Sequence, residues 1–199
     1  MIKGVVFDLD GVYFRNGKRN FIKNISSRYG VDIELVRKVF LRSEQMKRYK
    51  KGEMQGYEFW KYAIEKWGIE SAPEQILETM KQGYEINQLA VDVIRRLRES
   101  GIKSIICSNN FRERIEVLNQ RFGFLKDFDY VILSYEHGIL KPELFEKAPE
   151  KTGFKPEEIA ILDDGKEIIE EAGNMGFMAI FCEDQDRIEE YLEKIGINI

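Results

Sequence analysis

Two aspartates separated by one residue, Asp8 and Asp10, directly follow the apolar run Val5-Val6-Phe7. This run is typical of a strand buried on both faces, so the two acids fall where the strand should end. Side chains two positions apart on a strand point to the same side, which predicts that both carboxylates share one small volume. Two like charges repel by about 4 kcal/mol at about 4 Å and an effective dielectric of about 20. A bound cation is therefore the expected counter-charge.

The same residues have a second interpretation, because Asp and Gly are also common turn residues. On its own, Asp8-Leu9-Asp10-Gly11 could be no more than a polar strand end that runs into a turn. Short motifs match by chance, so the remainder of the chain has to decide between a turn and a site.

The composition limits the class of protein. The 199 residues, of which 43% are hydrophobic, suffice for one well-buried domain or a domain with a modest insertion. The net charge of −4, with 31 Lys and Arg scattered among 35 Asp and Glu, argues against a nucleic-acid partner. No basic, apolar leader precedes the first strand, and no apolar run reaches the roughly 18 residues that span a bilayer. We expect a cytoplasmic protein without a membrane partner, either a monomer or a homodimer.

Helical periodicity dominates residues 20–84, and alternating helices and strands follow from Leu89 onward. We expect strands at 102–107, 130–133, 159–162 and 177–181, with helices between them that include 142–152 and 168–175. Such alternation predicts an α/β fold: a doubly wound, Rossmann-like parallel sheet covered on both faces. The core would comprise residues 1–14 and 89–199, and residues 15–88 would form an inserted α-helical cap.

The strand order predicts where the polar strand ends meet. In a doubly wound sheet of order 3-2-1-4-5, or an extension of it, the first, second and fourth strands are neighbours. Their carboxyl ends carry Asp8, Ser108 and the pair Asp163-Asp164, so one crevice would collect all of them.

The side chains of this crevice suit phosphoryl transfer. Carboxylates are ligands that Mg²⁺ prefers together with water and substrate phosphate. Ser108 and Asn109 offer donors for phosphate oxygens at what we expect to be the start of a helix, and Lys141 offers a positive charge. A cation, a lysine and N–H donors around a carboxylate would neutralise the charge that spreads over a transferring phosphoryl group.

Four segments of the chain resemble, in order, the motifs of the haloacid dehalogenase-like superfamily. They are Phe7–Val12, Ile106–Asn109, Lys141-Pro142 and Ile161–Asp164. The pattern is similar in particular to phosphatases with a helical cap after the first motif, such as sugar-phosphate phosphatases and the phosphatase domain of soluble epoxide hydrolases. The resemblance covers essentially the whole chain.

The resemblance implies a Mg²⁺-dependent phosphatase that hydrolyses a small-molecule phosphate monoester. Asp8 would be the nucleophile that forms an aspartyl-phosphate, and Asp10 would protonate the leaving alcohol and then accept a proton from water. Ser108, Asn109 and Lys141 would bind the phosphoryl group.

The resemblance also implies a ligand set for Mg²⁺. Asp8, the backbone carbonyl of Asp10 and Asp164 would hold the ion, and Asp163 would orient Asp164 or a metal-bound water. One position departs from the family pattern: Ile168 stands where related enzymes often place an acid or Asn near the metal's water shell, and the adjacent Glu167 would face elsewhere on the helix.

Three alternatives remain on the same fold. A haloacid dehalogenase is disfavoured by Asp10, because a halide leaves without a proton. A phosphomutase would use the same motifs and pass the phosphoryl group to a second sugar. A non-catalytic binding protein is possible because a fold does not fix a function.

Residues outside the four motifs are candidates for contact with the substrate. The basic run from Lys47 to Lys51 is usually a solvated helix end, although in the insert it could meet an anionic substrate. Asn110 and Arg112 are expected to face the cap.

Overall fold

The centre of the fold is a parallel five-stranded sheet with the order β5-β4-β1-β6-β7. The computed structural model describes residues 1–199. Its sheet contains β1 (Gly4–Phe7), β4 (Lys103–Ser108), β5 (Tyr130–Leu133), β6 (Ile159–Asp163) and β7 (Met178–Phe181). In chain order these strands run 3-2-1-4-5, so the predicted doubly wound α/β fold is confirmed. The ends of β1, β4 and β6 consequently lie next to one another.

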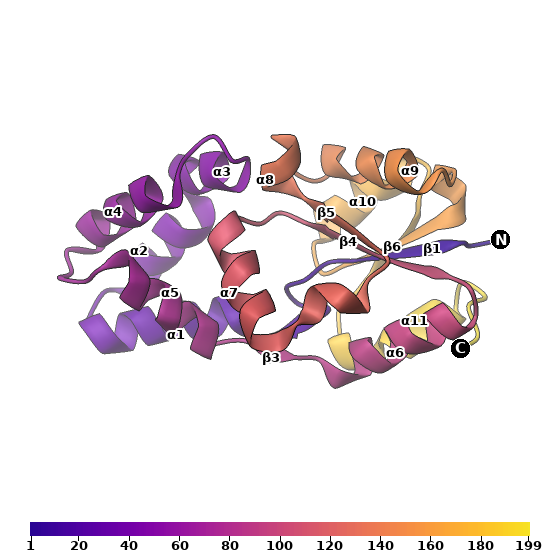
Figure 1. Cartoon of the computed structure of the whole chain (residues 1–199), viewed down its shortest axis with the longest axis horizontal. Helices are drawn as coiled ribbons and strands as arrows, with labels where there is room; N and C mark the ends of the chain where they lie inside the picture. The colour runs from indigo at the N-terminus through magenta and orange to yellow at the C-terminus, as the bar shows by residue number, and fades with distance from the viewer.

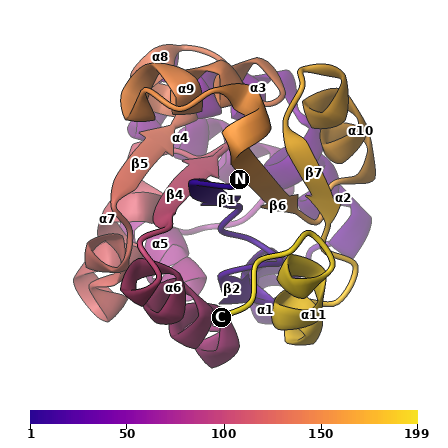
Figure 2. The same ribbon diagram turned by 90° about the vertical axis from the view of Figure 1, so that its right-hand side faces the viewer.

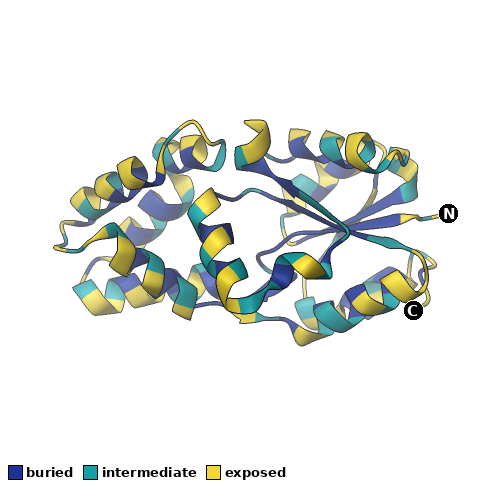
Figure 3. Ribbon diagram, viewed as in Figure 1, coloured by how far each residue is buried: buried dark blue, intermediate teal, exposed yellow.

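Helices cover both faces of the sheet (Figure 2). On one side lie α6 (Gln88–Glu99) and α11 (Ile188–Glu193), and on the other α9 (Lys147–Thr152) and α10 (Lys166–Asn174). Side chains alternate along β1 accordingly: Val5 and Phe7 belong to the apolar cluster on the first side, and Val6 to the cluster on the second. The central strands are therefore buried on both faces, as Figure 3 shows.

A group of helices lies beyond the carboxyl ends of the strands, on the left in Figure 1. It contains α1 (Gly17–Tyr29), α2 (Ile33–Arg37), a π-helical turn at Lys38–Arg42, α3 (Glu44–Lys50), α4 (Gly56–Trp67) and α5 (Pro73–Gln82). The two-residue strands β2 (Phe14–Arg15) and β3 (Glu85–Ile86) pair antiparallel where the chain enters and leaves this group. Next to α5 lies α7 (Arg112–Phe122). None of the helices has the length and apolar character needed to cross a membrane.

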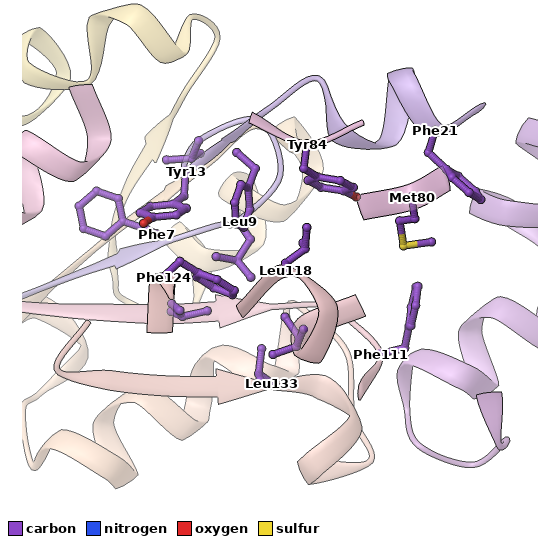
Figure 4. Close-up of a cluster of buried hydrophobic side chains, with 14 of the residues drawn as sticks. Phe7, Leu9, Tyr13, Phe21, Met80, Tyr84, Phe111, Leu118, Phe124 and Leu133 are labelled. Atoms are coloured by element: carbon purple, nitrogen blue, oxygen red, sulfur yellow. The ribbon is translucent and has the colours of Figure 1, made fainter. Parts of the chain in front are cut away.

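One apolar cluster runs from the sheet into this helical group (Figure 4). Phe7 and Leu133 contribute from the sheet side, Phe21 and Met80 from α1 and α5, and Tyr84 from the segment before β3. Because the cluster is continuous, we expect the helical group and the sheet to unfold together.

The structure corrects the predicted helix at 142–152. A 3-10 helix at Glu143–Glu146 precedes α9 at Lys147–Thr152. Pro149 lies in α9 and has no backbone N–H to donate to the carbonyl four residues earlier, which explains the interruption. A one-turn helix, α8 (Ser134–His137), was not predicted from the sequence.

We predict that Phe14→Ala lowers the free energy of unfolding by about 3–5 kcal/mol, because Phe14 is fully buried and its loss leaves a cavity. Its ring lies 5.1 Å from that of Phe124 and 5.6 Å from that of Tyr84 between ring centroids. Urea denaturation measures the change, and Tyr57→Ala, at an aromatic residue that is 68% exposed, is the control. Equal stability of the two variants would contradict the packing role of Phe14.

Candidate active site

Side chains from three strand ends and one loop meet at Asp8. The Asp8 carboxylate accepts hydrogen bonds from Ser108 Oγ, at the end of β4, at 3.1 Å and from Lys141 Nζ at 2.7 Å. Lys141 Nζ also donates to Asp163 Oδ2, at the end of β6, at 2.6 Å. The structure thus brings together Asp8, Ser108, Lys141 and Asp163, all of which are at most 8% exposed.

An excess of negative charge surrounds Lys141. Asp8, Asp163 and Asp164 each place one carboxylate oxygen within 4.8 Å of the other two. Burial and then the charge of Asp8 raise the pKa of Asp164 to about 6. Burial also raises the pKa of Asp163, and Lys141 offsets this only in part. Three hard oxygen donors with one ammonium among them fit a divalent cation such as Mg²⁺.

Gly11 lets the loop after β1 pass close to this acidic cluster. Its φ of +82° lies in the left-handed region, and a Cβ at this position would lie 2.2 Å from Asp164 Oδ2. Only glycine combines this backbone conformation with so close an approach.

Asp10 is not one of the three clustered carboxylates, although its charge acts on Asp164. Its carboxylate forms ion pairs with Arg114 and, at 3.1 Å, with Lys18 Nζ. Strand β1 ends at Phe7, so the alternation of side chains does not extend to residue 10. Burial alone would raise the pKa of Asp10, but Arg114 and Lys18 together hold it well below its usual value. The protein itself supplies the counter-charge of Asp10.

Asn109 holds the loop that carries Lys141. Its side-chain oxygen accepts a hydrogen bond from the Lys141 backbone N–H at 2.9 Å. The expectation that Ser108 and Asn109 begin a helix is wrong, because α7 starts only at Arg112. The Asn109 side chain, which precedes α7, therefore positions Lys141, the candidate catalytic lysine.

Asn110 and Arg112 both lead toward the helical group. The Asn110 N–H donates to Ser134 Oγ at 2.9 Å, and this hydroxyl lies 2.6 Å from the Lys50 carbonyl oxygen of α3. Arg112 lies over the ring of Tyr135 and lines a hollow whose lining from the insert consists of Tyr49, Gly52, Met54, Gln55 and Gly56. The position of Arg112 agrees with the expectation that it faces the insert, whereas the buried Asn110 side chain donates to Ser108 Oγ at 3.5 Å.

Lys18 and Arg114 were not predicted from the sequence, and Lys50 was predicted only as part of a basic run. Arg114 is fully buried although it is charged, and it lies over the ring of Tyr84. One signal was available: Arg114 is three residues after Phe111 and four before Leu118, on the apolar face of α7. A charged residue on such a face requires a buried partner.

Ile168 offers no ligand to the acidic cluster. Its side chain is half-buried and packs against the apolar cluster on the α10 side of the sheet, and Glu167 is exposed. The cluster of Asp8, Asp163 and Asp164 therefore gains no further acid from position 168 or from Glu167.

The sequence and the fold place the chain in a known class of hydrolases. Residues 2–176 match the haloacid dehalogenase-like hydrolase family. The chain therefore belongs to this family, and the resemblance seen in its four motifs is confirmed.

Two relatives illustrate the range of similarity in sequence. An uncharacterized hydrolase of Schizosaccharomyces pombe is 28% identical over 218 residues, which cover 97% of this chain and 96% of that protein. An uncharacterized protein of Dictyostelium discoideum is 30% identical over 143 residues, which cover 70% of this chain. The match spans 61% of the length of the Dictyostelium protein.

Solved structures share the fold at lower identity. A HAD family enzyme from Bacteroides thetaiotaomicron superposes with a TM-score of 0.79 at 23% identity, covering 90% of this chain and 93% of that one. A structure of its complex with magnesium and inorganic phosphate gives 0.78 at 23% identity, with 91% and 94% covered. L-2-haloacid dehalogenase from Xanthobacter autotrophicus gives 0.67 at 20% identity, with 100% and 85% covered. These likenesses extend over the helical group as well as the sheet.

We predict that MgCl₂ raises the melting temperature more at pH 7.5 than at pH 5. The folded-state pKa of Asp164, about 6, lies above its ordinary value of 3.8. Without metal, ionising Asp164 therefore costs stability as the pH rises from 3.8 to about 6, and a cation reverses this cost. Below that pKa a proton competes with the metal.

Thermal unfolding at both pH values, with NaCl of equal ionic strength as the control, measures the effect. Asp164→Asn should abolish the difference between MgCl₂ and NaCl. An equal Mg²⁺ effect at the two pH values would contradict the role of Asp164 as a ligand.

Proposed function

We propose that the chain is a Mg²⁺-dependent phosphatase that hydrolyses a small-molecule phosphate monoester through an aspartyl-phosphate on Asp8. The observation that carries this proposal is the position of Asp8. Its carboxylate touches Ser108 and Lys141 and borders the acidic cluster of Asp163 and Asp164. A nucleophile, a fixed cation and a site for a divalent ion thus share one point. In this proposal residues 1–14 and 89–199 form the catalytic core, and residues 15–88 form the cap.

In the first half of the reaction an Asp8 oxygen attacks phosphorus and the bond to the leaving oxygen breaks. Lys141 Nζ and Ser108 Oγ, which contact Asp8, would hold two oxygens of the phosphoryl group. Asp8, Asp164 and the backbone carbonyl of Asp10 would hold Mg²⁺, which neutralises the charge of the phosphoryl oxygens when bound. Asp163 keeps Lys141 in place through the 2.6 Å contact.

Asp10 would serve both halves of the reaction, first as acid and then as base. Lys18 and Arg114 keep it ionised in the resting site, which is the form that accepts a proton from the hydrolytic water. The first half needs the protonated form. A dianionic phosphoryl group beside Asp10 adds negative charge and so raises its pKa, which favours that form when the substrate is bound.

A second candidate is a haloacid dehalogenase, because an L-2-haloacid dehalogenase shares the fold. Asp10 disfavours it, since a departing halide needs no proton and this chain nevertheless buries a carboxylate between two cations. Release of chloride from 2-chloropropionate without metal would support the dehalogenase. A phosphomutase would transfer the phosphoryl group to a second sugar. It would release inorganic phosphate only when that sugar is absent. A binding protein without catalytic activity would turn over neither substrate.

We predict that Asp8→Asn reduces hydrolysis of p-nitrophenyl phosphate to background, because an amide is not a nucleophile for phosphorus. Asp10→Asn should lower kcat by about 10²- to 10⁴-fold, the usual contribution of a general acid and base. Release of p-nitrophenolate with and without Mg²⁺ is the measurement, and circular dichroism verifies the fold of each variant. Asp92→Asn, on α6 outside the site, is the control. Near-normal turnover by Asp8→Asn would refute the assigned nucleophile.

A further inference from the structure

A hollow lined by cations lies beside the active site, between α1 and the segment formed by α2 and the π-helical turn. Its polar lining consists of four basic side chains, Lys18, Arg19, Lys23 and Arg37. Its apolar lining consists of Ile22, Ile33 and Leu41. No acidic residue lines it, although acidic residues outnumber basic ones in the whole chain.

Lys18 joins this hollow to the reacting groups. Its Nζ atom lies 3.1 Å from Asp10 Oδ2, and its side chain is 36% exposed. One end of the hollow therefore lies at the carboxylate that would protonate the leaving group. A substrate with its phosphorus at Asp8 would point its leaving group toward Lys18.

Three basic side chains surround Asp10. Lys18 and Arg114 pair with its carboxylate, and Lys50 lies close enough to both cations to be affected by their charges. Burial, and then the charges of Lys18 and Arg114, lower the pKa of Lys50 to about 7. Lys18, Arg114 and Lys50 thus lie near Asp10, and the charge of Asp8 also acts on all three. An additional anion in the hollow would be attracted by these cations.

The outer cations are also available to a ligand. Arg37 pairs with Glu34 at 2.9 Å, whereas Arg19 and Lys23 form no ion pair and are exposed. Lys18 and Lys23 are five residues apart on α1, which corresponds to about 7.5 Å along the helix. The basic lining therefore extends away from Asp10 over roughly the length of a sugar.

We propose that this hollow binds a second anionic group of the substrate, so that the substrate is a phosphate monoester whose alcohol part carries a further phosphate or carboxylate. The inference rests on the proposed phosphatase function and adds the substrate class to it. Lys18, Arg19 and Lys23 bind the second anion, and the carbon skeleton between the two anionic groups packs on Ile22 and Leu41. A neutral alcohol part would leave Arg19 and Lys23 without an anionic partner.

Matched pairs of substrates test the inference and distinguish the two kinds of anion. 3-Phosphoglycerate and glycerol 3-phosphate differ by a carboxylate in place of a hydroxymethyl group, and glucose 1,6-bisphosphate and glucose 6-phosphate differ by a phosphate. We expect kcat/KM to be about tenfold or more higher for the more anionic member of at least one pair, as hydrogen bonds to a charged group predict. Equal values within both pairs would overturn the inference.

A double variant locates the preference in the hollow. Arg19→Gln with Lys23→Gln should lower the ratio of kcat/KM within the preferred pair by about tenfold. The matched control is Lys61→Gln with Lys66→Gln, which removes two exposed cations from α4 and should leave the ratio unchanged. An unchanged ratio in the Arg19 and Lys23 variant would overturn the inference.

Two further measurements separate failure of this inference from failure of the proposed function. If the chain hydrolyses p-nitrophenyl phosphate but shows no preference within either pair, the inference about the hollow fails. The proposed phosphatase function is then unaffected. If the chain hydrolyses no phosphate ester, the proposed function fails, and calorimetry with Asp8→Asn decides about the hollow. Tighter binding of glucose 1,6-bisphosphate than of glucose 6-phosphate, or of 3-phosphoglycerate than of glycerol 3-phosphate, would support it, and equal binding within both pairs would refute it.

Discussion

The repulsion among Asp8, Asp163 and Asp164 is the constraint on which the active site depends. Their nearest oxygens lie within 4.8 Å of one another, and Lys141 is the one basic side chain hydrogen-bonded to this group. The order of the parallel strands creates the repulsion, because β1 and β6 are adjacent and end at the same edge of the sheet. Lys141 offsets part of this repulsion, and a divalent cation would offset more of it.

The charges of the site form an acidic region and a basic region, and Asp8 acts on both. The acidic region contains Asp163 and Asp164, and the basic region contains Lys18, Arg114 and Lys50 around Asp10. The two ends of a phosphate ester have different requirements in the same way: its phosphoryl oxygens need a metal, and its leaving oxygen needs a proton. The helical group supplies Lys18 and Lys50 to the basic region. In the proposed reaction the inserted helices would therefore contribute to the chemistry of the leaving group as well as to the shape of the site.

The sequence predicted the features that local patterns encode. Alternating helices and strands fixed the strand order, and the polar strand ends identified Asp8, Ser108 and Asp163, which the structure brings together with Lys141. Partners that depend on tertiary packing were harder to predict. Lys18 and Arg114 come from helices whose orientation toward Asp10 no local pattern specifies, so the pairing of Asp10 with two cations of the protein was not predicted. The catalytic roles themselves stay predictions.

Beryllium fluoride tests the central claim most directly, because it mimics a phosphoryl group on an aspartate carboxylate and its fluorine atoms are visible by NMR. The account predicts bound ¹⁹F resonances that require Mg²⁺ and disappear in Asp8→Asn. They should persist in Asp92→Asn, on the distant helix α6. Resonances that form without Mg²⁺, or that survive Asp8→Asn, would contradict a magnesium-assisted phosphoenzyme at Asp8.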